Sequence, residues 1–315
     1  MADVIKTATR DAYGKALVEL GQKNDKVIVF DADLAAATKT GMFKKEFPER
    51  FIDCGIAEGN MMGVAAGMAT AGYTVFASSF AMFAAGRAFE QERNTIGYPH
   101  INVKIGATHA GISVGEDGAS HQCCEDIALM RTIPGMTIIN PADDIEARLA
   151  VMAAAETDGP VYMRFGRLAV PRIFDENYKF EIGKGVYLKE GKDVTIIATG
   201  LMVERALQAA EQLKAEGIDA AVINMATIKP IDRDIIVDAA KKTGAIVTAE
   251  EHSVIGGLGE AVAGVVAETT PVPVLRVGVE DTFGKSGPAL ELLEILGLNA
   301  ENICKKAKQA IENKQ

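Results

Sequence analysis

The chain has 315 residues, of which 48% are hydrophobic and 24% are charged, and its formal net charge is −10. This length and composition predict a globular protein with room for two α/β domains, and they exclude a disordered or fibrous chain. The acidic balance argues against a nucleic-acid surface or an anionic membrane as partner.

The expected compartment is a reducing cytoplasm. No apolar run reaches the roughly 18–20 residues that a bilayer span needs. The first residues, "MADVIKTATRDAYGKAL", carry charges where a signal peptide would need an apolar centre. Cys54, Cys123, Cys124 and Cys304 are too few and too oddly placed for a disulfide framework. We therefore expect a cytoplasmic protein without a membrane segment.

Strand-like and helix-like segments alternate along the first half of the chain. The predicted elements are strands 27–34 and 50–56, helix 58–72, strand 73–79, helix 80–97, strand 101–108, a short helix near 124–133, strand 136–141, helix 143–156 and strand 160–166. This order predicts a mainly parallel sheet with helices on both faces.

Residues 171–192 interrupt the alternation, because they are rich in charge, Gly and Pro. This composition predicts a connection between two domains, which could include a hairpin. A second series follows, with strands 194–200, 219–225, 245–251 and 271–279, helices 201–216, 233–243 and 257–268, and a helical tail. We predict two α/β domains, 1–180 and 190–315, each a mainly parallel or mixed sheet flanked by helices.

The segment "THAGISVGEDGASHQ" (108–122) carries two of the four histidines, His109 and His121. It offers no apolar face at either the helix or the strand period, and its glycines indicate a loop with unusual backbone angles. Two imidazoles and two carboxylates on one loop predict a binding or catalytic site. Arg164 and Arg167 are candidates for a local basic site that binds phosphorylated metabolites despite the acidic chain.

Three common sites find little support. Gly256, Gly257 and Gly259 do not complete G-x-G-x-x-G, which favours a tight strand-to-helix turn over a dinucleotide site. His121 clusters with Cys123 and Cys124, but adjacent cysteines do not give the ligand spacing of zinc. No G-x-S-x-G elbow of a serine hydrolase is present.

Glu58 stands directly after a predicted strand and opens the helix of "EGNMMGVAAGMATAG". A carboxylate in a first helical turn is favourable in any protein, which is the purely structural explanation. A helix with so few bulky side chains is, however, suited to close packing against another helix. Its first carboxylate would then be shielded from water and able to hold a proton.

These segments resemble the pyrimidine-binding domain of thiamin diphosphate enzymes, and specifically of transketolase. In that family a Glu at the head of such a helix contacts N1′ of the aminopyrimidine, and Glu58 matches that position. The stretch "ASSFAMFAAGRAFEQERN" resembles the family segment whose aromatic residues line the pyrimidine, which maps Phe80 and Phe83 to that pocket. Asp33, in "DADL", matches an acidic residue close to the thiamin.

The loop extends the resemblance, because transketolases carry a His, then Gly-Glu-Asp-Gly, then a second His followed by Gln. By resemblance, His109 and Arg167 hold the sugar phosphate, Asp117 contacts a hydroxyl of the acceptor, and His121 contacts the two-carbon fragment. Glu58, His109 and His121 are then the implied catalytic residues. Residues 190–315 resemble the C-terminal domain of the family, with "EEHSVIGGLGEAVA" in its usual place.

The chain also departs from the family pattern. Ala37 stands where relatives have a phosphate-binding Ser, and Thr38 or Thr40 are possible substitutes. The Gly-Asp-Gly…Asn motif that binds Mg²⁺ and the diphosphate is absent, and the chain is roughly half a transketolase. The resemblance thus implies a split transketolase of the pentose phosphate pathway, an α₂β₂ assembly whose N-terminal subunit supplies the Mg²⁺ ligands.

Alternatives within the superfamily are a 1-deoxy-xylulose 5-phosphate synthase-like enzyme and the beta subunit of a 2-oxo acid dehydrogenase. The synthase has an Asp where His109 stands, and the dehydrogenase subunit usually lacks the Gly-Glu-Asp-Gly…His-Gln loop. A non-catalytic partner that keeps the fold is a further alternative, although the presence of Glu58 and both histidines argues against it. A stand-alone Rossmann-type dehydrogenase is disfavoured by the incomplete glycine motif.

Overall fold

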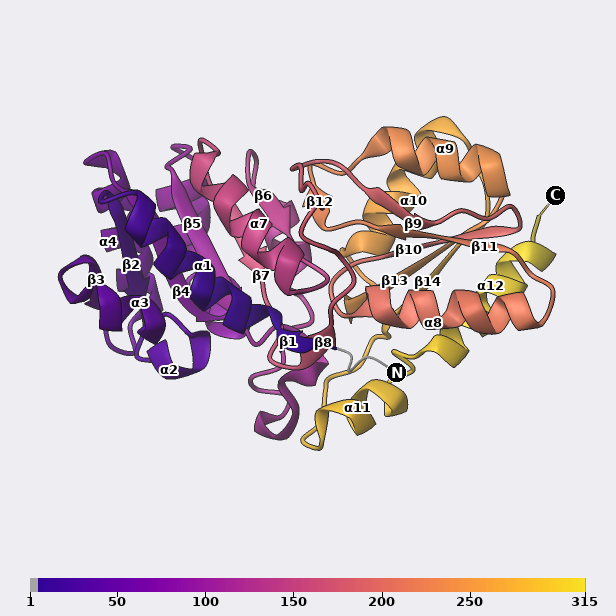
Figure 1. The fold of residues 1–315 in the computed structure, drawn as a ribbon, viewed down its shortest axis with the longest axis horizontal. Coiled ribbons are helices and arrows are strands. Elements are labelled where there is room, and N and C mark those ends of the chain that lie inside the picture. Colours follow the sequence, from indigo (N-terminus) through magenta and orange to yellow (C-terminus); the bar gives the residue numbers. More distant parts are fainter. Residues whose placement is uncertain (1–4, 315) are drawn as a thin grey trace.

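The computed structural model describes residues 5–314, which form two α/β domains lying side by side (Figure 1). The first domain is built on a seven-stranded sheet with the order β12-β6-β7-β5-β4-β2-β3, parallel except for β12. Its strands are β2 (Val27–Asp31), β3 (Phe51–Asp53), β4 (Thr74–Phe80), β5 (Val103–Thr108), β6 (Thr137–Ile139), β7 (Val161–Arg164) and β12 (Thr227–Lys229).

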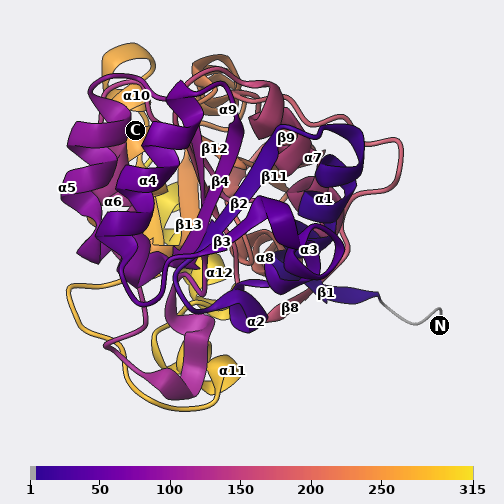
Figure 2. The ribbon, with the colours of Figure 1, turned by 90° about the vertical axis from the view of Figure 1, so that its left-hand side faces the viewer.

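Helices cover both faces of this sheet, because its central strands are apolar on both sides. One face carries α1 (Thr9–Lys23), α3 (Gly41–Glu46) and α7 (Asp144–Glu156). The other carries α4 (Glu58–Thr70), η2 (Met82–Arg87), α5 (Phe89–Gln91), η3 (Glu92–Gly97) and α6 (Asp126–Arg131). Figure 2 shows the two groups on opposite sides of the sheet. The short helices α2 (Ala35–Thr38) and η1 (Pro48–Arg50) lie between β2 and β3.

The second domain has a five-stranded sheet with the order β14-β13-β10-β11-β9, in which only β9 is antiparallel among the described strands. Its strands are β9 (Val186–Lys189), β10 (Val194–Ala198), β11 (Ala220–Asn224), β13 (Ile246–Ser253) and β14 (Val274–Val279). Its helices are α8 (Met202–Ala215), α9 (Arg233–Thr243), α10 (Leu258–Thr269), α11 (Ala289–Ile295) and α12 (Ala300–Glu312).

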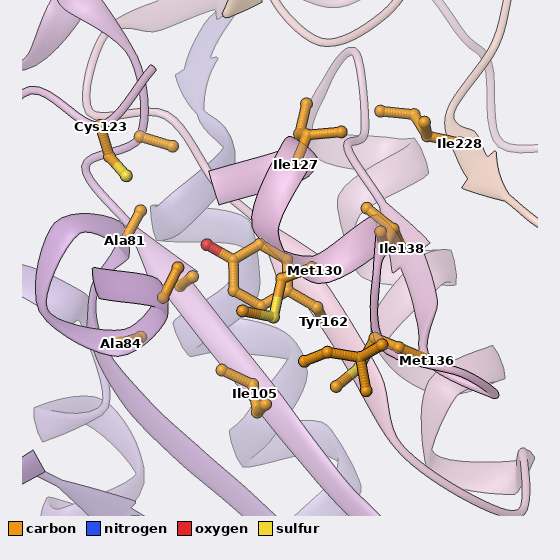
Figure 3. Packing of buried hydrophobic residues seen from close by; sticks show 14 of the residues in the cluster. Ala81, Ala84, Ile105, Cys123, Ile127, Met130, Met136, Ile138, Tyr162 and Ile228 are labelled. Carbon is orange, nitrogen blue, oxygen red and sulfur yellow. The ribbon is translucent and has the colours of Figure 1, made fainter. Parts of the chain in front are cut away.

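The hydrophobic core is continuous between the two domains. Strand β12 comes from the second half of the chain but pairs with β6 of the first sheet, so that Ile228 enters the first core. There it belongs to the same buried cluster as Ile127, Ile138 and Tyr162 (Figure 3). The Tyr162 hydroxyl donates to Asp126 Oδ2 at 2.9 Å, which satisfies the one polar atom of this buried ring.

The predicted fold class is confirmed, whereas several local predictions are wrong. Residues 171–192 form no hairpin, because β8 (Ala169–Pro171) pairs with β1 (Lys6–Ala8) and β9 joins β11 of the second sheet. The helix predicted over 80–97 is largely present, but Phe80 belongs to β4 and the helix includes two π-helical segments, η2 and η3.

Several elements had no counterpart in the prediction, and α1 and β12 are the two that matter most for the packing. Residues 1–4 of the first predicted domain lie outside the described part of the chain. Within that part, no helix combines the length and the apolar character needed to cross a membrane.

Replacing Ile228 by Ala tests how strongly β12 contributes to the first core. Because Ile228 is 2% exposed, we expect the substitution to lower the free energy of unfolding by about 2–4 kcal/mol, from lost burial and the cavity left behind. Urea unfolding followed by circular dichroism measures this change. Ile255→Ala, at a side chain that is 55% exposed, is the matched control and should change it by less than about 0.5 kcal/mol. Equal effects of both substitutions would contradict the packing described for β12.

Candidate active site

The predicted site residues follow the carboxyl ends of parallel strands of the first sheet. Asp33 follows β2, Glu58 follows β3, Phe80 ends β4, His109 follows β5 and Arg167 follows β7. In open α/β sheets this edge is where ligands bind, because the loops that leave the strands converge there. Residues scattered over more than 130 positions of the sequence are therefore brought to one edge.

Glu58 is the first residue of α4, and its side chain is 1% exposed. Arg87 Nη1 donates to both carboxylate oxygens, at 2.9 and 3.0 Å. Arg87 reaches this position from η2, where its guanidinium also lies 4.5 Å from the centre of the Phe83 ring. The π-helical turn places Phe83 and Arg87 on one side, and such turns are frequent at functional sites. The expectation that Glu58 is shielded from water holds already within the single chain.

Aromatic rings connect the two histidines of the loop. His109 stacks on Phe80 with ring centres 3.8 Å apart, and Phe80 lies parallel to Phe83 at 5.9 Å. The ring of His121 meets Phe83 edge-on at 5.3 Å. The structure thus brings together His109, His121, Phe80 and Phe83. Arg87 connects Glu58 to this group, because it pairs with Glu58 and lies over the Phe83 ring.

His109 is held as a neutral ring. Its Nε2 lies 2.9 Å from Arg10 Nη1, and because arginine can only donate, Nε2 accepts and Nδ1 carries the proton toward Thr108 Oγ1, 2.9 Å away. Burial, and next the positive charges of Arg10, Arg167 and Lys39, lower the pKa of His109 to about 3. The surroundings of His109 are therefore cationic although the whole chain is acidic.

The two threonines considered as phosphate ligands are engaged elsewhere. Both Thr38 and Thr40 are fully buried, and their hydroxyls donate to Asp31 Oδ2 at 2.7 and 2.8 Å. Asp31 is buried at the end of β2, and burial raises its pKa to about 6. Thr38 and Thr40 therefore do not replace the missing Ser at Ala37. The backbone carbonyl of Ala37 accepts from Arg10 at 3.0 Å.

The two arginines of the predicted basic site have different surroundings. Arg164 is buried in an ion pair with Asp126 (2.9 Å), so its prediction as a phosphate ligand is wrong. Arg167 is 38% exposed, donates to the Val114 carbonyl and pairs with Glu116 at 3.0 Å. Arg167 is also close enough to His109 to lower its pKa.

Two predicted site residues, Asp33 and Asp117, are exposed, and in the described part of the chain neither forms a hydrogen bond or ion pair with another predicted site residue. The backbone N–H of Asp33 donates to Asp53 Oδ1 at 3.0 Å, and its φ is +61°. Asp117 ends the 3₁₀ segment η4 (Ile112–Asp117), and within residues 5–314 its side chain makes no hydrogen bond. Both remain predictions.

Two arginines that contact this cluster were missed by the sequence reasoning. Arg87 follows Phe83 by four positions, so the helical spacing was a usable signal for it. Arg10 lies 99 residues before His109 and comes from α1, which the strand pattern did not reveal. Only the packing of α1 against the sheet brings Arg10 to the loop.

Comparison with known proteins identifies the family to which this chain belongs. The family model of the transketolase pyrimidine binding domain matches residues 5–172, and that of the transketolase C-terminal domain matches residues 183–303. Together the two matches cover most of the chain, which belongs to the transketolase family.

Individual relatives agree with this assignment. The chain is 54% identical to a putative transketolase C-terminal section of Methanocaldococcus jannaschii, over 94% of each chain. It is 46% identical to a 6-deoxy-6-sulfo-D-fructose transketolase subunit of Clostridium sp., over 97% of this chain and 95% of that one. Human transketolase is 40% identical over 97% of this chain but only 49% of its own length.

A solved structure described as a split gene transketolase, inactive beta4 tetramer, superposes with a TM-score of 0.90 at 56% identity. The superposition covers 98% of this chain and 99% of the solved chain. The chain is thus a subunit of the split-transketolase type, and its family generally uses thiamin diphosphate.

The neutral state of His109 can be tested by NMR. With a folded pKa of about 3, the ring of His109 should not titrate between pH 5 and 8, whereas an unperturbed histidine titrates near 6.5. The unfolded state then binds more protons, so His109 lowers stability progressively as the pH falls from about 6.5 toward 3. The Cε1–Hε1 signals of the four histidines give the titration, and His109→Gln assigns the signal. A His109 midpoint above pH 5.5 would contradict the described surroundings.

Proposed function

We propose that this chain is the C-terminal subunit of a split transketolase that, with an N-terminal partner subunit, transfers a two-carbon ketol unit from a ketose phosphate to an aldose phosphate. The observation that carries the proposal is the grouping of a buried carboxylate, an aromatic wall and two histidines at the carboxyl edge of the first sheet. Its place in metabolism would be the pentose phosphate pathway.

The residues fit the aminopyrimidine of thiamin diphosphate. Glu58 offers a buried carboxylate that can share a proton with ring atom N1′, and Phe80 and Phe83 offer aromatic faces. When bound, the cofactor supplies the electron sink that cleavage of a carbon–carbon bond next to a carbonyl requires. We assign the Mg²⁺ ligands to the partner subunit, because this sequence lacks the Gly-Asp-Gly…Asn motif.

Arg87 and the cofactor would compete for the same carboxylate. In the isolated chain Arg87 engages both oxygens of Glu58, so a contact with N1′ must replace part of this pairing. The Arg87 side chain is 52% exposed, and it can withdraw toward solvent without opening the core. Glu58 would then hold or give up the proton at N1′, in a site from which the assembled subunits exclude water.

The cations around His109 support an anionic substrate. Arg10, Lys39 and Arg167 each place positive charge near His109, although Lys39 also pairs with Asp11 at 3.3 Å and Arg167 with Glu116 at 3.0 Å. A phosphate group would suit these cations. His109 itself is neutral, so we assign it hydrogen bonds to the substrate while the arginines and Lys39 provide the charge. Two relatives are named for a sulfonated and a phosphorylated sugar, 6-deoxy-6-sulfo-D-fructose and apulose-4-phosphate, and both sugars carry an anionic group.

The site would be completed only by the partner subunit. We propose an α₂β₂ assembly in which this chain is the β subunit, placed in the cytoplasm. The similar split transketolase described as an inactive beta4 tetramer supports the expectation that the chain alone does not turn over substrate.

Glu58→Gln tests the proposed role of the carboxylate. The purified complex with the partner subunit, thiamin diphosphate and Mg²⁺ should convert xylulose 5-phosphate and ribose 5-phosphate to sedoheptulose 7-phosphate, and the chain alone should not. Glu58→Gln should lower kcat by about 10²–10⁴-fold, because the amide cannot exchange a proton with N1′. Glu211→Gln, at an exposed glutamate of α8, is the control and should leave kcat unchanged. Consumption of pyruvate instead of the ketose phosphate would overturn the transketolase assignment.

Arg167→Leu tests the proposed phosphate contact. A hydrogen bond to a charged group contributes about 1.5–3 kcal/mol, so kcat/KM for a phosphorylated donor should fall about 10–100-fold. Steady-state kinetics with a donor that lacks a charged end group should show little change, and Arg167→Lys should retain part of the activity. Equal losses with both donors would argue that Arg167 acts only on the loop.

A further inference from the structure

The substrate loop, residues 108–122, faces the second domain along most of its length. Its glycines at 111, 115 and 118 all have positive φ, at +80°, +84° and +76°. Each lies against a residue of the second domain: a Cβ would clash with Glu251 at Gly111 and with Ser286 at Gly118, and would be tight against Gly287 at Gly115. The glycines thus permit both the backbone angles and the close approach of the second domain.

Glu251 makes the most specific of these contacts. It lies on β13, is 4% exposed, and its Oε1 accepts the backbone N–H of Ser113 at 2.6 Å. This bond links positions 138 residues apart and fixes the first turn of η4. A second contact holds the far end of the loop, where Gln122 Nε2 donates to the carbonyl of Lys285 at 2.8 Å and also toward the carbonyls of Ile112 and Gly115.

The base of the loop is closed by the same interface. Gly111 N–H donates to the Cys123 carbonyl at 2.8 Å. Arg164 Nη2 donates to the carbonyls of Cys123 at 3.2 Å and Glu251 at 2.8 Å. One guanidinium therefore holds the outgoing end of the loop and the strand that carries Glu251 at a fixed separation.

We propose that the second domain is the template on which the substrate loop is shaped, and that Glu251 is a positioning residue for that loop. Glu251 acts through Ser113 and does not need to touch the substrate. The segment that it holds leads into Asp117 and includes the Val114 carbonyl, which accepts from Arg167. The link to sugar binding rests on the proposed function, whereas the link from Glu251 to loop order does not.

Glu250 provides a matched control within the same strand. It is fully buried and also accepts backbone N–H groups, from Leu258 at 2.6 Å and Gly259 at 2.7 Å. These partners belong to α10 of its own domain. Glu250 and Glu251 thus share burial, chemistry and neighbourhood, but only Glu251 reaches the loop.

The test compares Glu251→Leu, Glu251→Gln and Glu250→Leu. Hydrogen exchange of the isolated chain, followed by mass spectrometry over 111–118, should be at least about tenfold faster in Glu251→Leu, because the buried Ser113 N–H loses its acceptor. Glu251→Gln retains a side-chain oxygen and should restore most of the protection. Glu250→Leu should lower the unfolding midpoint but leave exchange at 111–118 unchanged. In the complex, Glu251→Leu should raise the KM for the ketose phosphate about tenfold, with a smaller change in kcat.

Unchanged exchange at 111–118 in Glu251→Leu would overturn the proposal. So would faster exchange that spreads equally over both domains in Glu251→Leu and Glu250→Leu, because Glu251 would then be a general stabilising residue. Faster exchange confined to the loop with an unchanged KM upholds the positioning by Glu251, but it contradicts the assignment of the loop to sugar binding.

Discussion

The buried ion pair between Arg164 and Asp126 is the interaction on which the arrangement of this protein depends. Arg164 ends the strand β7 of the first sheet and is 3% exposed. Its guanidinium contacts the Asp126 carboxylate of α6, the Cys123 carbonyl directly after the loop and the Glu251 carbonyl of β13. Burial alone would lower the pKa of Arg164, but the carboxylates of Asp126 and Glu251 raise it above its ordinary value. Removing one member of such a pair typically costs about 3–5 kcal/mol, because the other charge is left buried. The same buried pair therefore stabilises both the packing of the two domains and the geometry of the loop.

A second constraint is electrostatic. The chain carries a net charge of −10, yet the groups that act on His109 are cations brought from three separate segments, Arg10, Lys39 and Arg167. Burial, reinforced by these cations, keeps the imidazole neutral, so that the positive charge lies on the arginines and the lysine and not on the ring. The net charge alone does not reveal these local cations, because it sums over surfaces far from the loop.

The sequence allowed the fold class and the alternation of elements to be predicted, because these depend on local periodicity. The grouping of the site residues at one edge of the sheet was not predicted, although it follows from parallel strands that end at a common edge. Glu58 and the two histidines were singled out from motifs on single segments, whereas Phe80 and Phe83 were singled out only through the resemblance to the transketolase family. The misinterpretation of Arg164 has a different origin. The local sequence around an arginine near a strand end is the same whether its side chain faces solvent or a second domain. The positions of Arg10 and β12 depend on tertiary packing, which no local pattern encodes.

Strand β12 has a consequence for how such a protein can be divided. It is encoded after β11 of the second sheet, yet it covers the β6 edge of the first and places Ile228 in that core. A fragment cut near residue 180 would leave β6 with open backbone groups and a gap in its hydrophobic cluster, which is the kind of edge that invites association with other strands. The two domains are therefore poor units for exchange between genes, and recombination within this family should move the pair together.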